Sequence, residues 1–154
     1  MHELIFAAVL ACQMAPGADT IALGSLEAHE QHRYQTQTGF KDRINLFEDV
    51  VERYAKEISK TRKEGRLTSL DGLGGHYEQV LGLLEKELAR PVNKKDRSRE
   101  LKRLEIRLRK SSDDFRGELS TVPTEHSGHF QKLIEATDKL RSKIIQILFS
   151  GVYK

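Results

Sequence analysis

Histidine is the residue type in this chain best suited to chemistry, and four of its six histidines form two pairs with i, i+3 spacing. The pairs are His29/His32 and His126/His129, and each has a carboxylate beside it. Residues three apart share one helix face, and neutral imidazoles bind Zn²⁺ or Cu²⁺, so either pair could grip one ion. The second pair begins a predicted helix, where the helix dipole keeps imidazole uncharged. We therefore select His126 and His129 as candidate metal ligands.

Exposed histidines at helix ends are the competing interpretation of the same pattern. The two pairs are expected at opposite ends of the molecule, which argues against a single four-histidine site. Neither pair matches the His-Glu-x-x-His motif of zinc proteases, because its members are only three apart. Nor do the pairs match the inward-facing Glu-x-x-His motifs of di-iron bundles. The metal hypothesis therefore stays with His126 and His129, and no resident cofactor is predicted.

A basic run gives the second candidate site. Between Lys94 and Lys110 the chain holds nine Lys or Arg and only three Asp or Glu. The leucines of this stretch take the apolar stripe, so the cations spread over the rest of a helix. Such a face suits anionic lipid headgroups or nucleic acid, but it lacks the interleaved aromatic residues that stack on bases. We select Arg103, Arg107 and Lys110 for contact with an anionic surface, and we predict no nucleic-acid partner.

Acidic residues on the neighbouring predicted helices offer a different interpretation of this run. They could pair with many of the cations and leave an ordinary solvated face with ion pairs between helices. The acidic residues in question are Glu48, Asp49, Glu52, Glu57, Glu78, Glu85 and Glu87.

Support for catalysis is weak. Ser127 lies between two histidines, but adjacent residues on a helix point in different directions, and no oxyanion-loop or nucleophile-elbow motif is present. A chain that lost a signal peptide would contain no Met, and there is no Cys-x-x-Cys-His motif, so haem is not indicated either. We expect a protein that is not an enzyme.

Four stretches that must position these residues repeat apolar side chains at steps of three, four and seven. Such spacing places each set on one stripe of an α-helix, and short connections favour antiparallel neighbours. The sequence therefore predicts an all-α fold, an antiparallel up-down-up-down four-helix bundle over residues 39–154. The stripes are Ile44, Phe47, Val51, Tyr54, Ile58; Leu70, Leu73, Tyr77, Leu81, Leu84, Leu88; Leu101, Leu104, Leu108, Phe115, Leu119; and Phe130, Leu133, Leu140, Ile144, Ile147.

Glycine and proline mark the ends of these helices. Gly65 is predicted to end the first helix in a left-handed conformation, and Pro91 disfavours helix at the residue before it. The glycines at 72–75 interrupt the second stripe without shifting its spacing, so we interpret that segment as helix. Residues 19–38 form a polar extension, in which 21–38 are either a short helix or a continuation of the next one. The predicted helices cover 40–64, 68–90, 96–119 and 124–150.

The N-terminus differs in kind from the rest. Leu4–Ala11 is apolar without a break and has the length of the hydrophobic region of a signal peptide, with small residues for cleavage after Ala18. We predict a signal peptide over 1–18 and a periplasmic or secreted protein. An apolar N-terminal helix packed against the bundle is the alternative. Val9-Leu10-Ala11-Cys12 also resembles the lipobox of bacterial lipoproteins, so a lipid anchor at Cys12 and membrane association remain open.

Composition limits the class of protein. The chain has 154 residues, of which 32% are charged and 38% hydrophobic, with three Pro, no Trp and a net charge of +3. One domain of long amphipathic helices fits these values, whereas a membrane bundle or a disordered chain does not. We expect an exported structural or protein-interaction module with an unidentified protein partner, acting as a monomer or a homodimer. The alternatives are a periplasmic metal-binding bundle and a peripheral binder of anionic membrane.

Three segments carry a resemblance to known proteins. They are LEAHE at 26–30, LKRLEIRLRK at 101–110 and ILFSG at 147–151. With these segments the stretch after residue 18 resembles exported bacterial helical-bundle proteins of unknown function. The resemblance implies no activity and assigns no role to individual residues.

Overall fold

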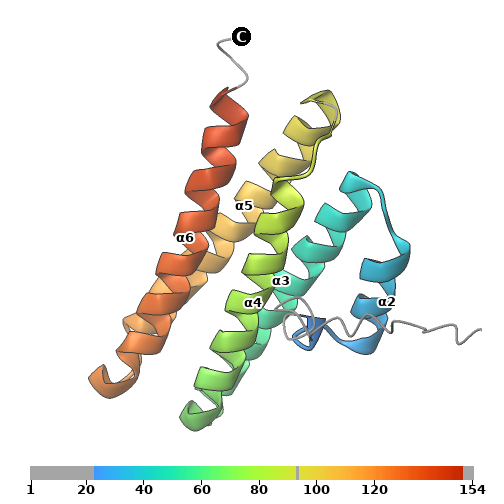
Figure 1. The fold of residues 1–154 in the computed structure, drawn as a ribbon. Helices are drawn as coiled ribbons and strands as arrows, with labels where there is room; N and C mark the ends of the chain where they lie inside the picture. Colours follow the sequence, from blue (N-terminus) through green and yellow to red (C-terminus); the bar gives the residue numbers. More distant parts are fainter. Residues whose placement is uncertain (1–22, 93, 151–154) are drawn as a thin grey trace, which may run out of the picture.

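We analysed a computed structural model of the chain, which describes residues 23–92 and 94–150. Every element in these residues is helical, which confirms the predicted all-α class. A short helix, α2, precedes four long ones, α3 to α6, and two 3₁₀ turns, η1 and η2, lead into α4 and α6 (Figure 1). The elements are α2 (Ala28–Thr36), α3 (Phe40–Lys63), η1 (Leu67–Ser69), α4 (Leu70–Leu88), α5 (Lys94–Leu119), η2 (Thr124–His126) and α6 (Ser127–Ser150).

The helix ends follow the local chemistry of the sequence. Gly65 has a φ of +71° and ends the turn after α3, as a residue without a Cβ can do at no steric cost. The backbone N–H of Arg66 then donates to the carbonyl of Thr61. The glycines at 72–75 lie inside α4, as the unbroken apolar spacing predicted. Pro123 precedes η2, so the fourth long helix starts with a 3₁₀ turn rather than directly.

The four long helices pack as two antiparallel hairpins, α3/α4 and α5/α6, placed side by side (Figure 1). The hairpins contact each other along α3/α5 and along α4/α6, so α4 and α5 lie diagonally across the core. Within each of these two contacts the helices run in the same direction, because residue numbers rise together on both. The pairs that fix the directions are Glu48–Arg103 and Arg62–Glu118 for α3/α5, and Asp71–His129 and Glu85–Lys143 for α4/α6.

This arrangement differs from the prediction at one connection. A short link was expected to make each helix the antiparallel neighbour of the next, and α3/α4 and α5/α6 agree with that. The link after α4 instead crosses the end of the molecule and leaves α5 beside α3. Small residues at this contact, Ala55 and Ser111, are both buried, and glutamates of α3 face arginines of α5. Packing and charge therefore override the preference set by loop length.

The predicted stripes form the core. Nearly all of their residues are buried; Leu73, Leu119 and Ile147 are only partly so. Aromatic rings meet at the centre, where the rings of Tyr77 and Phe115 lie edge to face with centroids 5.4 Å apart. This contact joins the two helices that lie on the diagonal.

The fifth helix, α2, explains two core residues outside the predicted stripes. Leu46 and Val50 are fully buried on the side of α3 away from α5, between positions that contact α2. The chain turns back at residues 37–39, so α2 lies antiparallel to α3 rather than extending it. For residues 21–38 the sequence left two alternatives, a short helix or a continuation of the next helix. The described part of this segment contains a separate short helix.

A buried ion pair fastens α2 to α3. Arg53 donates from Nε and Nη2 to the two carboxylate oxygens of Glu30, at 2.8 and 2.7 Å. The backbone N–H of Glu27 donates to the same carboxylate at 2.8 Å. Burial by itself raises the pKa of Glu30, but these hydrogen bonds and the charge of Arg53 outweigh burial and hold that pKa below its usual value. Glu30 therefore stays ionised near neutral pH.

The predicted signal peptide at 1–18 and the lipobox cysteine, Cys12, lie outside the described residues, and so does the choice between cleavage and lipidation. None of the described helices has both the length and the apolar run needed to cross a membrane.

A pair of truncations on α5 tests the position of the core. Leu104 is fully buried and Ile106, two residues on, is 55% exposed. We expect Leu104→Ala to lower the free energy of unfolding by about 2–5 kcal/mol and Ile106→Ala to change it by less than about 0.5 kcal/mol. Urea denaturation followed by circular dichroism measures both. Equal losses would mean that α5 turns a different side toward the core.

Candidate functional site

Ion pairs with α3 hold one flank of α5. Arg103 donates to Glu48 at 3.0 Å, and one turn further Arg107 lies 2.9 Å from Glu52. Glu48 is almost completely buried. Burial raises the pKa of Glu48, although the charges of Arg103 and Arg107 act in the opposite direction. These contacts confirm that acidic residues of α3 neutralise part of the basic run.

The same flank continues toward the end of α5. Glu118 is buried there and accepts hydrogen bonds from Arg62 and from the hydroxyl of Ser59, the latter at 2.5 Å. Next to Glu118 lies a polar groove of about 410 Å³ between α3 and α5. Small residues line it and leave this space between the two helices unfilled. Ser111 in this groove donates to the backbone carbonyl of Arg107 at 3.2 Å. Both hydroxyls thus donate within the protein, Ser59 to a carboxylate that Arg62 also binds and Ser111 to the backbone.

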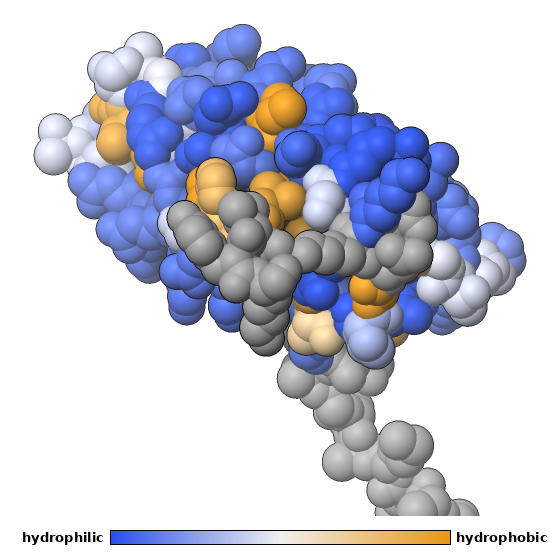
Figure 2. Space-filling view, turned by 90° about the horizontal axis from the view of Figure 1, so that it is seen from above, coloured by the Kyte–Doolittle hydropathy of each residue, from blue (hydrophilic) through white to orange (hydrophobic). Residues whose placement is uncertain are grey.

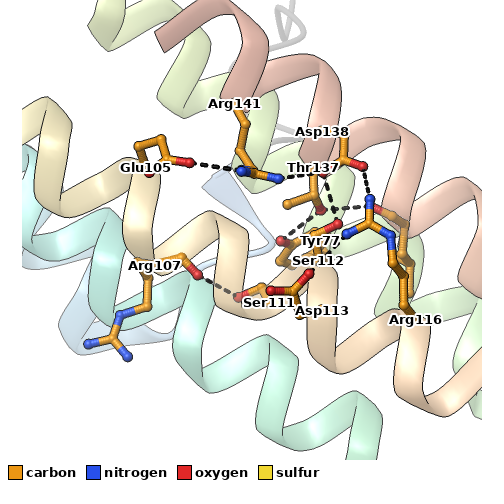
Figure 3. A network of polar contacts seen from close by, with 11 residues as sticks. Tyr77, Glu105, Arg107, Ser111, Ser112, Asp113, Arg116, Thr137, Asp138 and Arg141 are labelled. Atoms are coloured by element: carbon orange, nitrogen blue, oxygen red, sulfur yellow. Dashed lines mark hydrogen bonds and ion pairs between the residues drawn. The ribbon is translucent and has the colours of Figure 1, made fainter. Parts of the chain in front are cut away.

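Asp138 of α6 holds the opposite flank of α5 (Figure 3). Its carboxylate accepts from Ser112 at 2.9 Å and from Arg116, both on α5, and from Arg141 of its own helix at 3.0 Å. Arg141 in turn donates to Glu105 of α5 at 2.8 Å. On α6, therefore, the carboxylate of Asp138 and the guanidinium of Arg141 each bind α5, the first to a hydroxyl and an arginine and the second to a glutamate.

A buried hydroxyl contact completes this clamp. Tyr77 of α4 lies 3.1 Å from the hydroxyl of Thr137, which donates to the carbonyl of Leu133 at 2.6 Å (Figure 3). Burial raises the pKa of Tyr77 well above its usual value, so the phenol stays protonated. The hydroxyls of Tyr77 and Thr137 thus have structural partners.

With both flanks held, Ile106 is left at the centre of the outer face of α5. Cations stand three and four residues before and after it, the positions that surround a residue on a helix surface. They are Lys102, Arg103, Arg109 and Lys110, and all four are exposed. Lys102, Arg109 and Lys110 form no ion pair with any part of the chain that the structure describes. We call Ile106 and these four cations the α5 outer face.

The three residues selected from the sequence occupy different environments. Lys110 belongs to the α5 outer face and is unpaired there. Arg103 is exposed but shared between Glu48 and Glu100. Arg107 is turned toward α3 and bound to Glu52, so it contributes least to the outer face. Lys102 and Arg109, which were not selected, are exposed on the same face, and their spacing around an apolar residue off the stripe is visible in the sequence.

The two histidines selected as metal ligands lie together near the start of α6. Their rings are stacked with centroids 6.0 Å apart, and Nδ1 of His129 lies 2.8 Å from a carboxylate oxygen of Asp71 on α4. His126 is 3.7 Å from Glu125. His129 also lines a shallow groove of about 550 Å³ between α4 and α6. The structure therefore places His126 beside His129 and Asp71 beside His129, although these three are not among the described groups whose ligand atoms lie within 4.8 Å of one another.

The other histidine pair is placed differently. Glu27, His29 and Glu30 offer possible ligand atoms within 4.8 Å of one another, but His32 is not part of this group. Both oxygens of Glu30 are occupied by Arg53, which leaves this group organised around a guanidinium. It is a structural tie between α2 and α3.

Comparisons with protein-family models, with curated proteins and with solved structures each give no match to this chain.

The clamp on α5 can be tested by removing one charge. Asp138→Asn loses its attraction for two arginines, and we expect the free energy of unfolding to fall by about 1–2 kcal/mol. Asp113→Asn is the matched control, because Asp113 pairs only with Arg116 at the surface and should cost less than about 0.5 kcal/mol. Chemical denaturation at neutral pH compares the two variants, and losses of the same size would contradict a clamp centred on Asp138.

Proposed function

We propose that this protein is a non-enzymatic interaction module that binds an acidic partner surface on the α5 outer face. In this proposal the four long helices serve as an antiparallel four-helix bundle that holds the face rigid. The single observation that carries the proposal is the position of Ile106, an exposed apolar side chain inside a ring of four cations. Export and the choice between monomer and homodimer stay predictions.

The charge distribution supports an acidic partner. The acidic residues around α5 form ion pairs on its flanks and hold Arg103, which leaves Lys102, Arg109 and Lys110 of the outer face without an ion pair in the described residues. Unpaired cations that share one helix face raise the local potential and attract anionic surfaces. Binding would also bury the apolar side chain of Ile106, and the removal of that surface from water favours the complex. A face with charged residues alone would not provide this contribution.

The interior supports a non-catalytic role. The hydroxyls of Ser59, Ser111, Ser112 and Thr137 donate to structural acceptors, and Glu118, which accepts from Ser59 in the groove between α3 and α5, is also bound by Arg62. Catalysis needs a nucleophile with an adjacent base, or an equivalent acid and base in one cleft.

Charge reversal on the α5 outer face tests the proposal, with heparin as the acidic probe. We expect wild-type protein to be retained on a heparin column, and the triple variant Lys102→Glu, Arg109→Glu, Lys110→Glu to lose retention at low salt, because attraction becomes repulsion. Elution salt concentration is the measurement, and circular dichroism checks that the variant is folded.

A second triple variant controls for overall charge. Lys41, Lys132 and Lys139 are exposed and lie off α5, and changing each to Glu alters the net charge by the same amount. This control should elute close to wild type. If both triple variants lose retention equally, binding follows net charge alone and the proposed face is wrong.

The contact between His129 and Asp71 favours a second candidate function, a zinc-binding bundle. A carboxylate that accepts from Nδ1 leaves Nε2 to face a metal, which is the arrangement common around zinc. His126 supplies the second nitrogen from the same helix start. Both ligands named from the sequence would then be used.

Titration calorimetry with Zn²⁺ tests this second candidate. We expect one ion per chain, loss of binding in His126→Ala and in His129→Ala, and weakening of about 10- to 100-fold in Asp71→Asn. His32→Ala, an exposed histidine on α2, should bind as wild type does. Unchanged affinity in His129→Ala would eliminate the site.

A further inference from the structure

Exposed apolar side chains extend the α5 outer face onto α6. Three large hydrophobic residues are exposed in the part of the chain that the structure describes, and all lie on α5 or α6. They are Ile106, Ile145 and Phe149, with exposed fractions of 55%, 37% and 64%. A single exposed apolar residue is ordinary in a protein, but here all three that are exposed in the described residues lie on two helices that pack together.

The register between α5 and α6 places one of these residues, Ile145, beside the cations. Arg141 binds Glu105, so one turn further along α6 Ile145 comes level with Lys102 on the antiparallel α5. Ile145 continues the side of α6 that faces α5, since it lies four residues after Arg141. Figure 1 shows the two helices diverging toward the end of α6, the part of α6 in which Ile145 and Phe149 are exposed. Seen from that end, apolar side chains break the hydrophilic surface (Figure 2).

From this combination we infer that the acidic partner is the surface of an anionic phospholipid bilayer. The inference rests on the proposed function and deepens it. Lys102, Arg109 and Lys110 bind lipid phosphates and carboxylates, while Ile106, Ile145 and Phe149 enter the boundary between headgroups and acyl chains. Both kinds of contact are what a peripheral membrane face requires.

The shape of the face separates a bilayer from an acidic peptide or protein. Lys102, Arg109 and Ile106 project from the convex side of one helix, whereas Lys110 lies at the border of that side and also lines the polar groove between α3 and α5. A peptide binds best where a groove can cover it, whereas a convex face meets a broad surface. Apolar side chains among cations match the bilayer boundary, where charge and hydrocarbon lie within one side-chain length of each other.

The absence of Trp from the sequence makes the test direct, because one introduced Trp reports on its own position. The first variant is Ile106→Trp, in the proposed face. The matched control is Gly82→Trp on α4, where an added Cβ meets nothing within 4 Å and the residue is exposed. Each is mixed with vesicles of phosphatidylcholine alone and with vesicles that are roughly one third phosphatidylserine. Fluorescence emission and co-sedimentation are measured.

We expect the emission of Ile106→Trp to move to shorter wavelength only with the anionic vesicles, and that of Gly82→Trp to stay unchanged. In co-sedimentation, replacing Lys102, Arg109 and Lys110 by Ala should lower the partition coefficient by roughly a hundredfold, from about a fivefold contribution per cation. Phe149→Ser should weaken binding as well, while Lys41→Ala, with its cation off the face, should not.

Three outcomes would overturn the inference. If the protein binds heparin through the α5 outer face but ignores anionic vesicles, the partner is a soluble acidic molecule and the proposed function survives without this inference. If a DNA duplex binds through the same cations and vesicles do not, the partner is nucleic acid. If the protein binds neither heparin nor vesicles, the proposed function fails together with the inference.

Discussion

Carboxylates on both sides of α5 fix the rotation of this helix about its axis, and the outer face exists only because of that rotation. On one side Glu48, Glu52 and Glu118 bind arginines of the α3/α5 contact. On the other side, across the α5/α6 contact, Asp138 accepts from Ser112 and Glu105 accepts from Arg141. A helix with this many cations could turn several ways if only its leucines were considered. The ion pairs select one, in which paired arginines lie at the flanks and unpaired cations lie outward.

Close approach of α3 and α5 is what allows those pairs to form. Ala55 and Ser111 are small and buried at this contact, so the backbones come near enough for arginine and glutamate to meet across it. Parallel neighbours place like helix ends together, which the dipoles disfavour. The row of opposite charges along the contact offsets that disfavour. Ion pairs here set the partner and direction of each helix more than they add stability.

The fold class and the core were readable from the sequence, and the relative placement of the helices was not. Apolar spacing located the four long helices to within a few residues, because periodicity is set by backbone geometry alone. Leu46 and Val50 were missed, since they are buried by α2, an element whose own sequence is polar. Which helices are neighbours depended on side-chain size at Ala55 and Ser111, which periodicity does not encode.

The candidate sites show the same division. The basic run lies on one helix, as predicted, but Arg107, selected from the sequence, faces α3, whereas Lys102 and Arg109 are exposed. Arginine and lysine are equivalent in a count of charges, whereas their partners depend on tertiary contacts. Asp71 lies far from His129 in the sequence, so only the fold could join them. The exposed state of Ile145 and Phe149 likewise depends on where α5 leaves α6.

The grouping of the helices into two hairpins has a consequence for how the chain reaches its structure. Contacts within α3/α4 and within α5/α6 close short loops, which costs little chain entropy and proceeds quickly. Each hairpin can therefore collapse as a separate unit before the two halves meet. The seam between the halves, which contains the arginine–glutamate pairs of α3 and α5, can form only once both halves are in place.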